Sequence, residues 1–492
     1  MQRPRATRLG RAGFLAPLLL ATACASVPQL GAKPLPRPAT AFASTESLAG
    51  TQSAWPADQW WAGYGDAQLD RLIAEGLSGS PDLAAAAARF RTAQGLAQQA
   101  GAALLPSLDA TGSVDYQNQS QNLAGSGGRV PGGWHAAGTA GLALNFDLDL
   151  FGRNRAALRA AKKDAEAARV DADEARLLLT TGIASTYADL AALYAQRDNL
   201  EAALDIRTQS LTVVKARYDA GLETIDTVRQ AEARLPQTRG DIQATDEAIM
   251  LDKHALAALV GAGPDRALSI ARPDVALLKP RGVPADASTD LIGRRPDIAA
   301  SRARVEAAAE RIKEARAAFY PNINLSALAG FASLGLGNLF SSGSAFAGAT
   351  PAVSLPLFHG GALQGQYRGR RGQYDEAVAL YDAAVIEALR ETADTVTSQQ
   401  SLAAQLAESR SALAAYEDAL RVARGRYQEG VTDYLTVLTA QESVVQARLA
   451  LARLESRAFT LDVQLVRALG GGFAAPQPAT AVRQPQTHSA GE

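Results

Sequence analysis

Residues 144–168, LNFDLDLFGRNRAALRAAKKDAEAA, join two kinds of periodicity with no loop between them. As far as Phe151, apolar side chains alternate with polar or acidic ones, a pattern typical of a β-strand with one apolar face. From Gly152 to Tyr218 proline is absent, and Gly182 is the only interior glycine. This composition predicts roughly 100 Å of uninterrupted helix at about 1.5 Å per residue. A strand with an acidic face that leads directly into a very long helix is rare in soluble proteins.

The composition of the 492 residues argues against several classes of function. The net charge is −1, which gives no general attraction to nucleic acid or to anionic membrane surfaces. The sequence contains no P-loop, no Rossmann glycine pattern and no G-x-S-x-G motif, and its four histidines form no metal-type cluster. We therefore predict that the protein is not an enzyme, with no catalytic residue, no metal and no cofactor other than a covalent lipid.

The amino-terminal segment has the features of an export signal. Four arginines precede a short apolar run, and small residues then lead to Cys24, the only cysteine of the chain. We predict a lipoprotein signal peptide over residues 1–23, a palmitate-type lipid on Cys24, and a linker over residues 24–54. Ala25, in place of an aspartate, predicts delivery to the outer membrane. The alternative is an ordinary signal peptide with an incidental cysteine, because Leu20 lies one place too early for the usual lipoprotein pattern.

Most of the remaining chain consists of an internal sequence repeat. A helix that starts at Pro81 and stops before Pro106 has a second copy that starts at Pro296 and stops before Pro321, 215 residues later. The triplet that begins at residue 150, LFG, matches LFH at residue 357 with an offset of 207, so the first copy has eight extra residues in between. Two further landmarks, around Tyr218 and Tyr427 and around Gly261 and Gly470, are offset by 209. The predicted segments are a first repeat, an equatorial linker, a second repeat and a disordered tail, over residues 55–264, 265–290, 291–472 and 473–492.

Each repeat has two alternating segments before its long helix. In the opening stretch the apolar face, which we expect to contact lipid, holds Leu144, Phe146 and Leu148. The polar face, which we expect to line an aqueous lumen, holds Asn145, Asp147 and Asp149. A soluble β-sandwich has the same period, but the chain is exported and each segment has about the 9–11 residues of a tilted membrane strand. Four strands cannot close a barrel, and an open edge is not tolerated in lipid. Two chains would supply eight strands and three would supply twelve.

Beyond the leader no run of 18 apolar residues occurs, so we predict no transmembrane helix. The long helices instead have heptad patterns and return as antiparallel coiled-coil hairpins. The turn of each hairpin has a tyrosine followed three residues later by a glycine, which suits the end of a helix. These turn residues are Tyr218 and Gly221 in the first repeat and Tyr427 and Gly430 in the second. Near the tips, Asp226, Asp433 and Leu435 are candidates for a narrow entrance, with ordinary solvated charges as the alternative for the two acids.

The doubled "PD…LP" helix, the "LFGR" strand exit and the paired "RY…G" tips resemble the TolC-like outer-membrane efflux factors, in particular the lipidated NodT/OprM-type subgroup. The resemblance covers about residues 55–472. It implies a mixed, mainly α fold: long hairpins form an α-helical barrel, and four strands per protomer close a transmembrane β-barrel in a homotrimer. It also implies a passive exit duct in the outer membrane of a Gram-negative bacterium, with a periplasmic adaptor and an inner-membrane RND-type transporter as partners.

One position departs from the family pattern. Members often place an aspartate just beyond the "YLTVL" segment of the second tip, where this chain has Thr439. The entrance is therefore expected to be looser or to use other residues.

Two other functions remain open from the sequence: a duct for secreted proteins of the type I system, and a periplasmic coiled-coil adaptor or scaffold. The amphipathic strands favour a duct, because an adaptor would need none.

Overall fold

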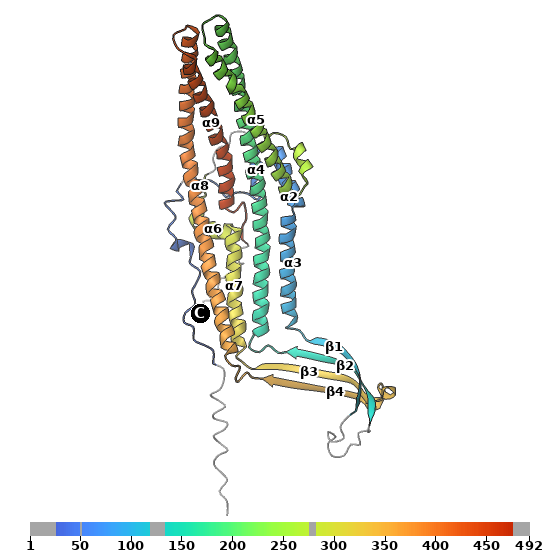
Figure 1. Ribbon diagram of the computed structural model, residues 1–492. Coiled ribbons are helices and arrows are strands. Elements are labelled where there is room, and N and C mark those ends of the chain that lie inside the picture. Colours follow the sequence, from blue (N-terminus) through green and yellow to red (C-terminus); the bar gives the residue numbers. More distant parts are fainter. Residues whose placement is uncertain (1–25, 50–51, 119–132, 275–281, 476–492) are drawn as a thin grey trace, which may run out of the picture. The chain divides into compact units, whose positions relative to one another are not determined.

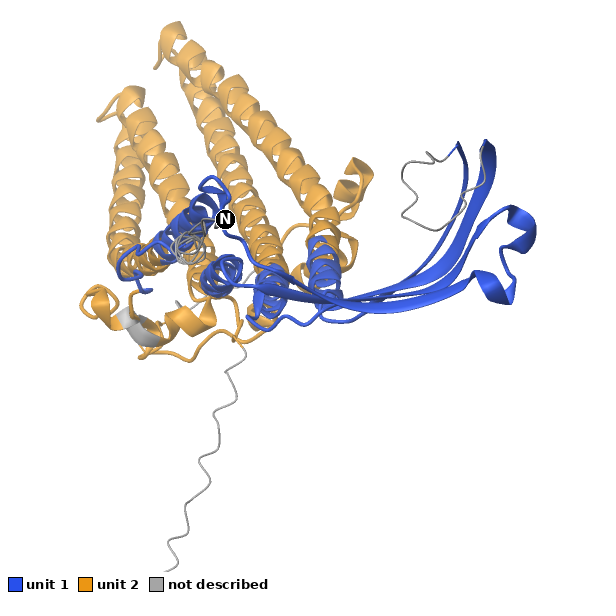
Figure 2. Cartoon of the chain, turned by 90° about the horizontal axis from the view of Figure 1, so that it is seen from below, with its two compact units in different colours: residues 1–36, 89–168, 301–381 blue, residues 37–88, 169–300, 382–492 orange. Residues whose placement is uncertain are grey.

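The computed structural model describes residues 26–49, 52–118, 133–274 and 282–475. The chain forms two compact units, and each unit combines parts of both sequence repeats (Figure 2). Unit 1 contains the amino-terminal arm as far as Pro36 together with Arg89–Ala168 and Ser301–Tyr381. Unit 2 contains Arg37–Ala88, Arg169–Ala300 and the chain from Asp382 onward. None of the described helices combines the length and the apolar character that a membrane crossing requires.

Unit 1 is built around one antiparallel sheet whose four strands lie side by side in sequence order (Figure 1). The strands are β1 (Ser107–Asn118), β2 (Trp134–Asp147), β3 (Asn322–Leu334) and β4 (Ala345–Ser354). The central pair, β2 and β3, joins the first repeat to the second, and β1 and β4 form the two edges.

Both second strands of the repeats end three residues earlier than their alternating pattern. β2 stops at Asp147 because Asp149 takes a left-handed conformation, φ +44°, that turns the backbone out of the ladder. β4 stops at Ser354, two residues before Pro356, which has no N–H to donate. The predicted lumen residue Asp149 therefore does not lie on the strand.

The helices repeat with equal lengths, which reflects the doubled sequence. The first helix of each repeat has 22 residues, in α3 (Pro81–Ala102) and α7 (Pro296–Ala317). The long helices α4 (Arg153–Asp219) and α8 (Ala362–Gln428) have 67 residues each, and the return helices α5 (Ile225–Leu259) and α9 (Tyr434–Ala468) have 35 each. Pro236 lies inside α5 without ending it. The shorter helices are α2 (Ala67–Gly79) and α6 (Ala287–Arg294).

The helical part of unit 1 is held by ion pairs between the two repeats. Three pairs join α4 to α7: Arg159 with Glu310 at 2.7 Å, Lys163 with Glu306 at 2.8 Å, and Arg311 with Asp164. The predicted linker also has contacts in this unit. The guanidinium of Arg371 on α8 donates to the carbonyls of Gly31 and Ala32, and the Tyr374 hydroxyl donates to the Pro34 carbonyl.

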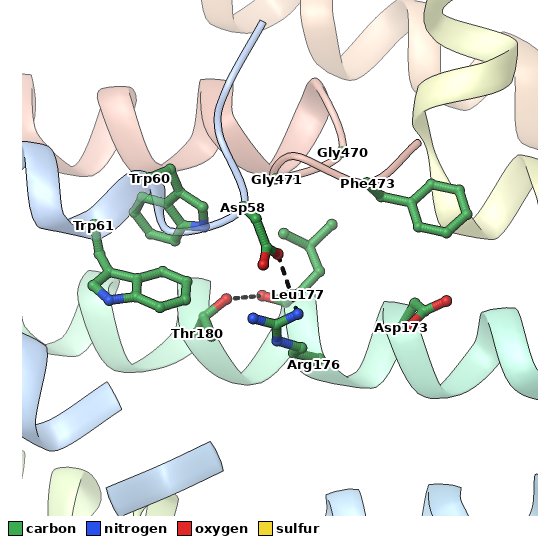
Figure 3. A pocket seen from close by; sticks show the side chains of 10 residues that line it. All are labelled: Asp58, Trp60, Trp61, Asp173, Arg176, Leu177, Thr180, Gly470, Gly471 and Phe473. Carbon is green, nitrogen blue, oxygen red and sulfur yellow. Dashed lines mark hydrogen bonds and ion pairs between the residues drawn. The ribbon is translucent and has the colours of Figure 1, made fainter. Parts of the chain in front are cut away.

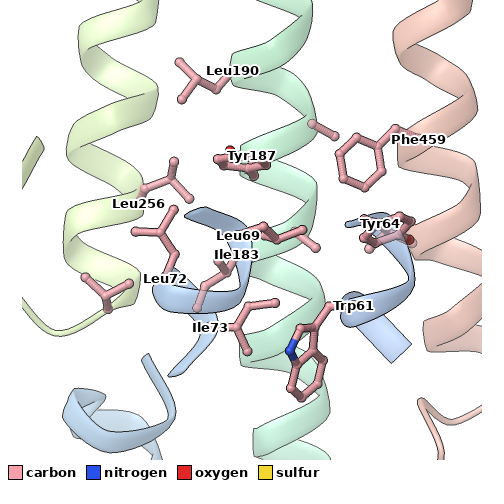
Figure 4. Close-up of a cluster of buried hydrophobic side chains, with 14 of the residues drawn as sticks. Trp61, Tyr64, Leu69, Leu72, Ile73, Ile183, Tyr187, Leu190, Leu256 and Phe459 are labelled. Carbon is pink, nitrogen blue, oxygen red and sulfur yellow. The ribbon is translucent and has the colours of Figure 1, made fainter. Parts of the chain in front are cut away.

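The main core of unit 2 forms where α2 packs among the long helices (Figure 4). Leu69, Leu72 and Ile73 point from one face of α2 onto α4 and α5, and all three are fully buried. Asp66 caps α2 by accepting hydrogen bonds from the backbone N–H groups of residues 68 and 69. The same carboxylate accepts a 2.6 Å hydrogen bond from the Tyr187 hydroxyl of α4.

A buried arginine opens α7 in the place where the first repeat has the serine before α3. Arg295 is 6% exposed, and its guanidinium bonds to Asp297 at 2.7 Å, to Glu391 of α8 at 2.7 Å and to the carbonyl of Ala468 at the end of α9. Arg295 therefore joins three helices of unit 2. Glu174 of α4 borders this cluster, and burial together with the charge of Asp297 raises its pKa to about 7.

Candidate functional site

The two hairpin tips share one turn geometry. After α4, Gly221 adopts φ +69° and the next N–H, of Leu222, bonds back to the Arg217 carbonyl at 2.8 Å. After α8, Gly430 adopts φ +76° and the Val431 N–H bonds back to the Arg426 carbonyl at 2.8 Å. Left-handed glycine with this backbone bond is the usual way to end a helix and reverse the chain. The predicted turn residues thus lie at the tips.

Below the tips the two hairpins pack on a shared apolar cluster of unit 2. Tyr427 of α8 and Tyr434 of α9 are 3% and 4% exposed, and their ring centroids lie 5.7 Å apart. The guanidinium of Arg217 on the first hairpin lies 4.5 Å above the Tyr427 ring, a favourable cation–π geometry. Burial, aided by the nearby Glu223 carboxylate, raises the pKa of the Tyr427 hydroxyl, which therefore stays neutral. Tyr218, the equivalent of Tyr427, is 40% exposed.

Polar contacts tie the first hairpin to the second along the same region. Arg207 of α4 is 8% exposed, and its guanidinium contacts the Thr238 hydroxyl of α5 and the Glu442 carboxylate of α9, the latter at 2.6 Å. Ser210 of α4 receives hydrogen bonds from Tyr434 at 3.2 Å and from the Gln441 amide at 3.1 Å. Sequence reasoning missed this bridge. The sequence feature that could have revealed it is Arg207, a charged residue among the mostly apolar heptad positions of α4.

The predicted entrance residues all lie on exposed faces near the tips. Asp226 lies in the first turn of α5 and accepts a hydrogen bond from Gln230 at 2.9 Å. Leu435 is 59% exposed, and Thr439, one helical turn further along α9, is also exposed. The opposite face of α9, with Tyr434 and Val437, is buried in the cluster. The structure thus leaves these three side chains free of the hairpin packing, and their role at an entrance remains a prediction.

Asp433 has a structural task that the sequence analysis did not assign to it. It is the N-cap of α9, and its carboxylate accepts hydrogen bonds from the Thr436 hydroxyl at 2.7 Å and the Thr436 N–H at 3.0 Å. These bonds lower the pKa of Asp433, so the residue stays ionised at neutral pH. Removing this side chain would therefore remove a helix cap as well as a charge.

At the other predicted site, the ends of the strands, the three acidic or amide residues have different surroundings. Asn145 is exposed on β2 and accepts a 3.0 Å hydrogen bond from Ser326 on β3. Asp147, the last residue of β2, accepts hydrogen bonds from the Asp149 N–H and the Asn154 amide.

Asp149 is only 7% exposed, unlike a residue that faces a lumen. Its carboxylate accepts from the N–H groups of Asn154 and Arg155, so it fixes the first turn of α4. Burial alone would raise the pKa of Asp149, but these hydrogen bonds outweigh it and lower the pKa. Asn145 and Asp147 thus lie on β2, where their role in lining a lumen remains a prediction, and Asp149 belongs to the helix start.

The described part of the chain has hollows in both units, and one of about 140 Å³ borders the tip cluster at Ser210, Tyr427 and Val437. A hollow of about 290 Å³ in unit 1 lies where the strands meet the helices and includes Phe151, Tyr320 and His359. A smaller one of about 60 Å³ in unit 2 lies between α4 and the end of α9 (Figure 3). Its charged groups are paired, since Arg176 bonds Asp58 at 3.1 Å. It has room for water rather than for a substrate. Within the described part of the chain no three His, Cys, Asp or Glu side chains are arranged to hold a metal ion.

Cys24, the predicted lipid anchor, lies outside the described residues, as do residues 476–492 of the predicted tail.

Comparison with known proteins gives one consistent result. The family model described as "Outer membrane efflux protein" matches residues 72–262 and 287–471, which confirms the internal repeat. The multidrug resistance outer membrane protein MdtP of Escherichia coli O6:H1 is 32% identical over 430 residues, covering 86% of this chain and 88% of its own. The pyoverdine export outer membrane protein OpmQ of Pseudomonas aeruginosa is 30% identical and covers 93% of this chain and 97% of its own.

Solved structures agree with the sequence relatives. The outer membrane protein VceC of Vibrio cholerae has a TM-score of 0.81 at 43% identity, covering 85% of this chain and all of its own. The outer-membrane channel OprN has a TM-score of 0.82 at 26% identity, covering 91% of this chain and 99% of its own. The mixed, mainly helical fold is thereby confirmed, and the chain belongs to the outer membrane efflux protein family.

Proposed function

We propose that three copies of this chain form the passive exit duct of a tripartite efflux system, which takes small molecules from a periplasmic adaptor and an inner-membrane RND-type transporter across the outer membrane. One observation carries this proposal. The sheet has four strands with apolar positions on one face, and β2 leads within a few residues into a 67-residue helix. Among the described residues no further strand pairs with either edge of the sheet. Open edges are costly in lipid, so further strands must come from other copies. Three copies supply the twelve strands of a closed barrel.

The exposed side chains at the hairpin tips favour a partner protein that docks there. Leu222 and Val431 occupy the same position of the two turns, directly after the left-handed glycine, and they are 64% and 70% exposed. Exposed aliphatic groups at equivalent points of both tips suit contact with an apolar partner surface. An adaptor protein is the partner that a tripartite duct requires at this position.

Small molecules are the cargo class that the relatives favour. MdtP is named for multidrug resistance, OpmQ for pyoverdine export and SrpC of Pseudomonas putida for solvent efflux. We expect the duct formed by this chain to pass compounds of comparable size. The transporter, rather than the duct, is expected to select them.

We further propose that Cys24 carries the lipid that holds the mature amino terminus in the outer membrane. The support is the position of the only cysteine directly after the leader. The arm that follows lies against α8, held by Arg371 and Tyr374. An anchored arm of this kind keeps the lipid close to the protein.

The test uses a host that lacks its own outer-membrane efflux channels. Ethidium accumulation is measured in cells that express a periplasmic adaptor and an RND-type transporter, with and without the chain. We expect accumulation to fall only when all three proteins are present. Equal accumulation with and without the chain would contradict the tripartite duct.

The tips provide a sharper variant. Leu222→Asp combined with Val431→Asp places charges on the proposed adaptor contact, and we expect this variant to lose ethidium efflux while its conductance in planar bilayers stays that of the parent. Lys253→Asp, an exchange on α5 outside the tips, is the matched control and should retain efflux. Normal efflux by the tip variant would show that these residues do not contact the adaptor.

A further inference from the structure

We infer that the hollow of about 290 Å³ in unit 1 is a recess of the duct wall that binds cargo with an anionic group next to a flat apolar body, such as an aromatic carboxylate or sulfonate. Arg153 would bind the anionic group, and the rings of Phe151 and Tyr320 would contact the flat part. This inference rests on the proposed duct and adds to it a class of cargo and the place where that cargo binds.

The hollow lies where three helices of unit 1 meet the ends of two strands. It is lined by the first residue of α4, the end of α7, the first turn of α8 and the adjoining ends of β3 and β4. All of these segments belong to unit 1. The volume of the hollow is close to the lower end of the range for small-molecule sites, about 300–1,000 Å³.

The strand register places the hollow on the predicted lumen face of the sheet. Asp147 lies opposite Asn324, and Asn322 lies opposite Ser354. Directly opposite residues of an antiparallel pair share a face, and so do residues two apart on one strand. Asn322 and Ser354, which line the hollow, therefore share the face of Asp147. If this face lines an aqueous lumen as predicted, the recess opens toward the path of the cargo.

The polar side chains of the hollow can supply several hydrogen-bond donors. Arg153 is exposed, and its guanidinium pairs with no carboxylate among the described residues. The side-chain amides of Asn322 and Gln366 and the imidazole of His359 line the same space. An unpaired guanidinium with further donors around it is the arrangement that binds a carboxylate, sulfonate or phosphate.

Asp149, the carboxylate among the described residues that line the hollow, offers little repulsion to an anion. It is buried and accepts hydrogen bonds from the N–H groups of Asn154 and Arg155. The guanidinium of Arg155 lies 3.1 Å from the same carboxylate. The charge of Asp149 is thus balanced by Arg155, and the charge of Arg153 remains available to a ligand.

Cations gather along the helix starts next to the hollow. Residues 153–163 of α4 include five arginines or lysines and no acid, and residues 362–372 of α8 include three and no acid. The whole chain, in contrast, has a net charge of −1. Ion pairs of α4 with α7 neutralise part of this local charge. The remaining excess raises the concentration of anions near the recess.

A flat apolar surface lies in the same hollow. Phe151 and Tyr320 stack with ring centroids 4.9 Å apart and planes 12° from parallel. The two residues are still 48% and 38% exposed, so part of their surface is accessible to a ligand. An aromatic body can pack on these rings while its anionic group reaches Arg153. A cationic aromatic compound would meet the same rings but would be repelled by the guanidinium.

Single-channel recordings of the full chain in planar bilayers test the recess. The probes are 2-naphthalenesulfonate, the naphthylmethylammonium ion of opposite charge, and methanesulfonate, which has no ring. We expect the naphthalenesulfonate to interrupt the current of the parent several-fold more often than either of the other two ions.

Variants of the recess assign the interruptions to Arg153. Arg153→Gln should lose most of the interruptions by naphthalenesulfonate, and Arg153→Lys should keep a part of them because it keeps the charge. Arg368→Gln is the matched control, since it removes the same charge from an exposed residue of α8 that does not line the hollow. This control should be interrupted as often as the parent.

The other outcomes separate this inference from the proposed duct. Equal interruption by the two naphthalene ions, or unchanged interruption of Arg153→Gln, would overturn the inference, and a conducting parent would leave the duct in place. Frequent interruption by methanesulfonate would remove the two rings from the site. A parent that does not conduct would overturn the duct and the recess with it.

A lipid headgroup also carries an anionic phosphate, so the same preparations are examined by native mass spectrometry after addition of phosphatidylglycerol. We expect the amount of bound lipid to be the same for the parent and Arg153→Gln. Lipid that binds the parent and is lost from Arg153→Gln, together with an absence of interruptions by naphthalenesulfonate, would assign the hollow to the membrane and overturn the cargo site.

Discussion

At the residue scale, Asp433 shows how a capping role and a charge can be separated. Asparagine keeps an N-cap oxygen, whereas alanine loses it and weakens the start of α9. If Asp433 lines the entrance, Asp433→Asn should reduce cation selectivity in single-channel recordings while thermal stability stays near that of the parent, because a ring of three carboxylates attracts cations. Asp433→Ala should show both effects. Unchanged selectivity in Asp433→Asn would remove this residue from the entrance.

Two neighbouring residues of β2 test which face meets lipid. Leu144→Arg should cost about 2–4 kcal/mol near the bilayer midplane, whereas Asn145→Arg should cost much less if residue 145 lines an aqueous lumen as predicted. The measurement is the yield of heat-resistant oligomer in outer membranes. Equal losses for the two variants would contradict the assigned faces.

At the element scale, the sequence predicted those features that depend on local periodicity. The long helices, their tips and the four strands follow from heptads, alternation and the proline and glycine landmarks, and the repeat then supplied each element twice. Contacts between distant segments were not predictable in this way. Arg207 and Arg295 are buried because acids from other helices meet them, and Asp149 left the strand because its own backbone turns there. No local pattern carries such information.

The cluster that joins α4, α7, α8 and α9 predicts a pH dependence. The folded-state pKa of Glu174 is about 7, above its ordinary value of 4.5, so the fold favours the protonated form. Stability from this group is therefore full below pH 4.5 and is lost as pH rises toward 7 and beyond. At pH 8, Glu174→Gln should increase the free energy of unfolding by on the order of 3 kcal/mol at most and so raise the midpoint of thermal unfolding. At pH 4 it should leave the midpoint unchanged. Circular dichroism at both pH values checks this, and an equal shift at both would contradict the pKa.

At the scale of the whole molecule, the four strands of one chain are a third of the twelve that the proposed trimer would close. Each copy supplies four strands with two open edges, together with two hairpins whose tips expose aliphatic groups. The proposed homotrimer would close the sheet edges, and the proposed adaptor would cover the exposed groups at the tips.

The number of copies in the assembly is the most direct test of this account. Native mass spectrometry of the full-length protein, extracted from outer membranes in a mild detergent, reports that number. The account predicts an assembly of three chains. A protein that is monomeric or dimeric in the membrane extract, with no three-chain species, would contradict it.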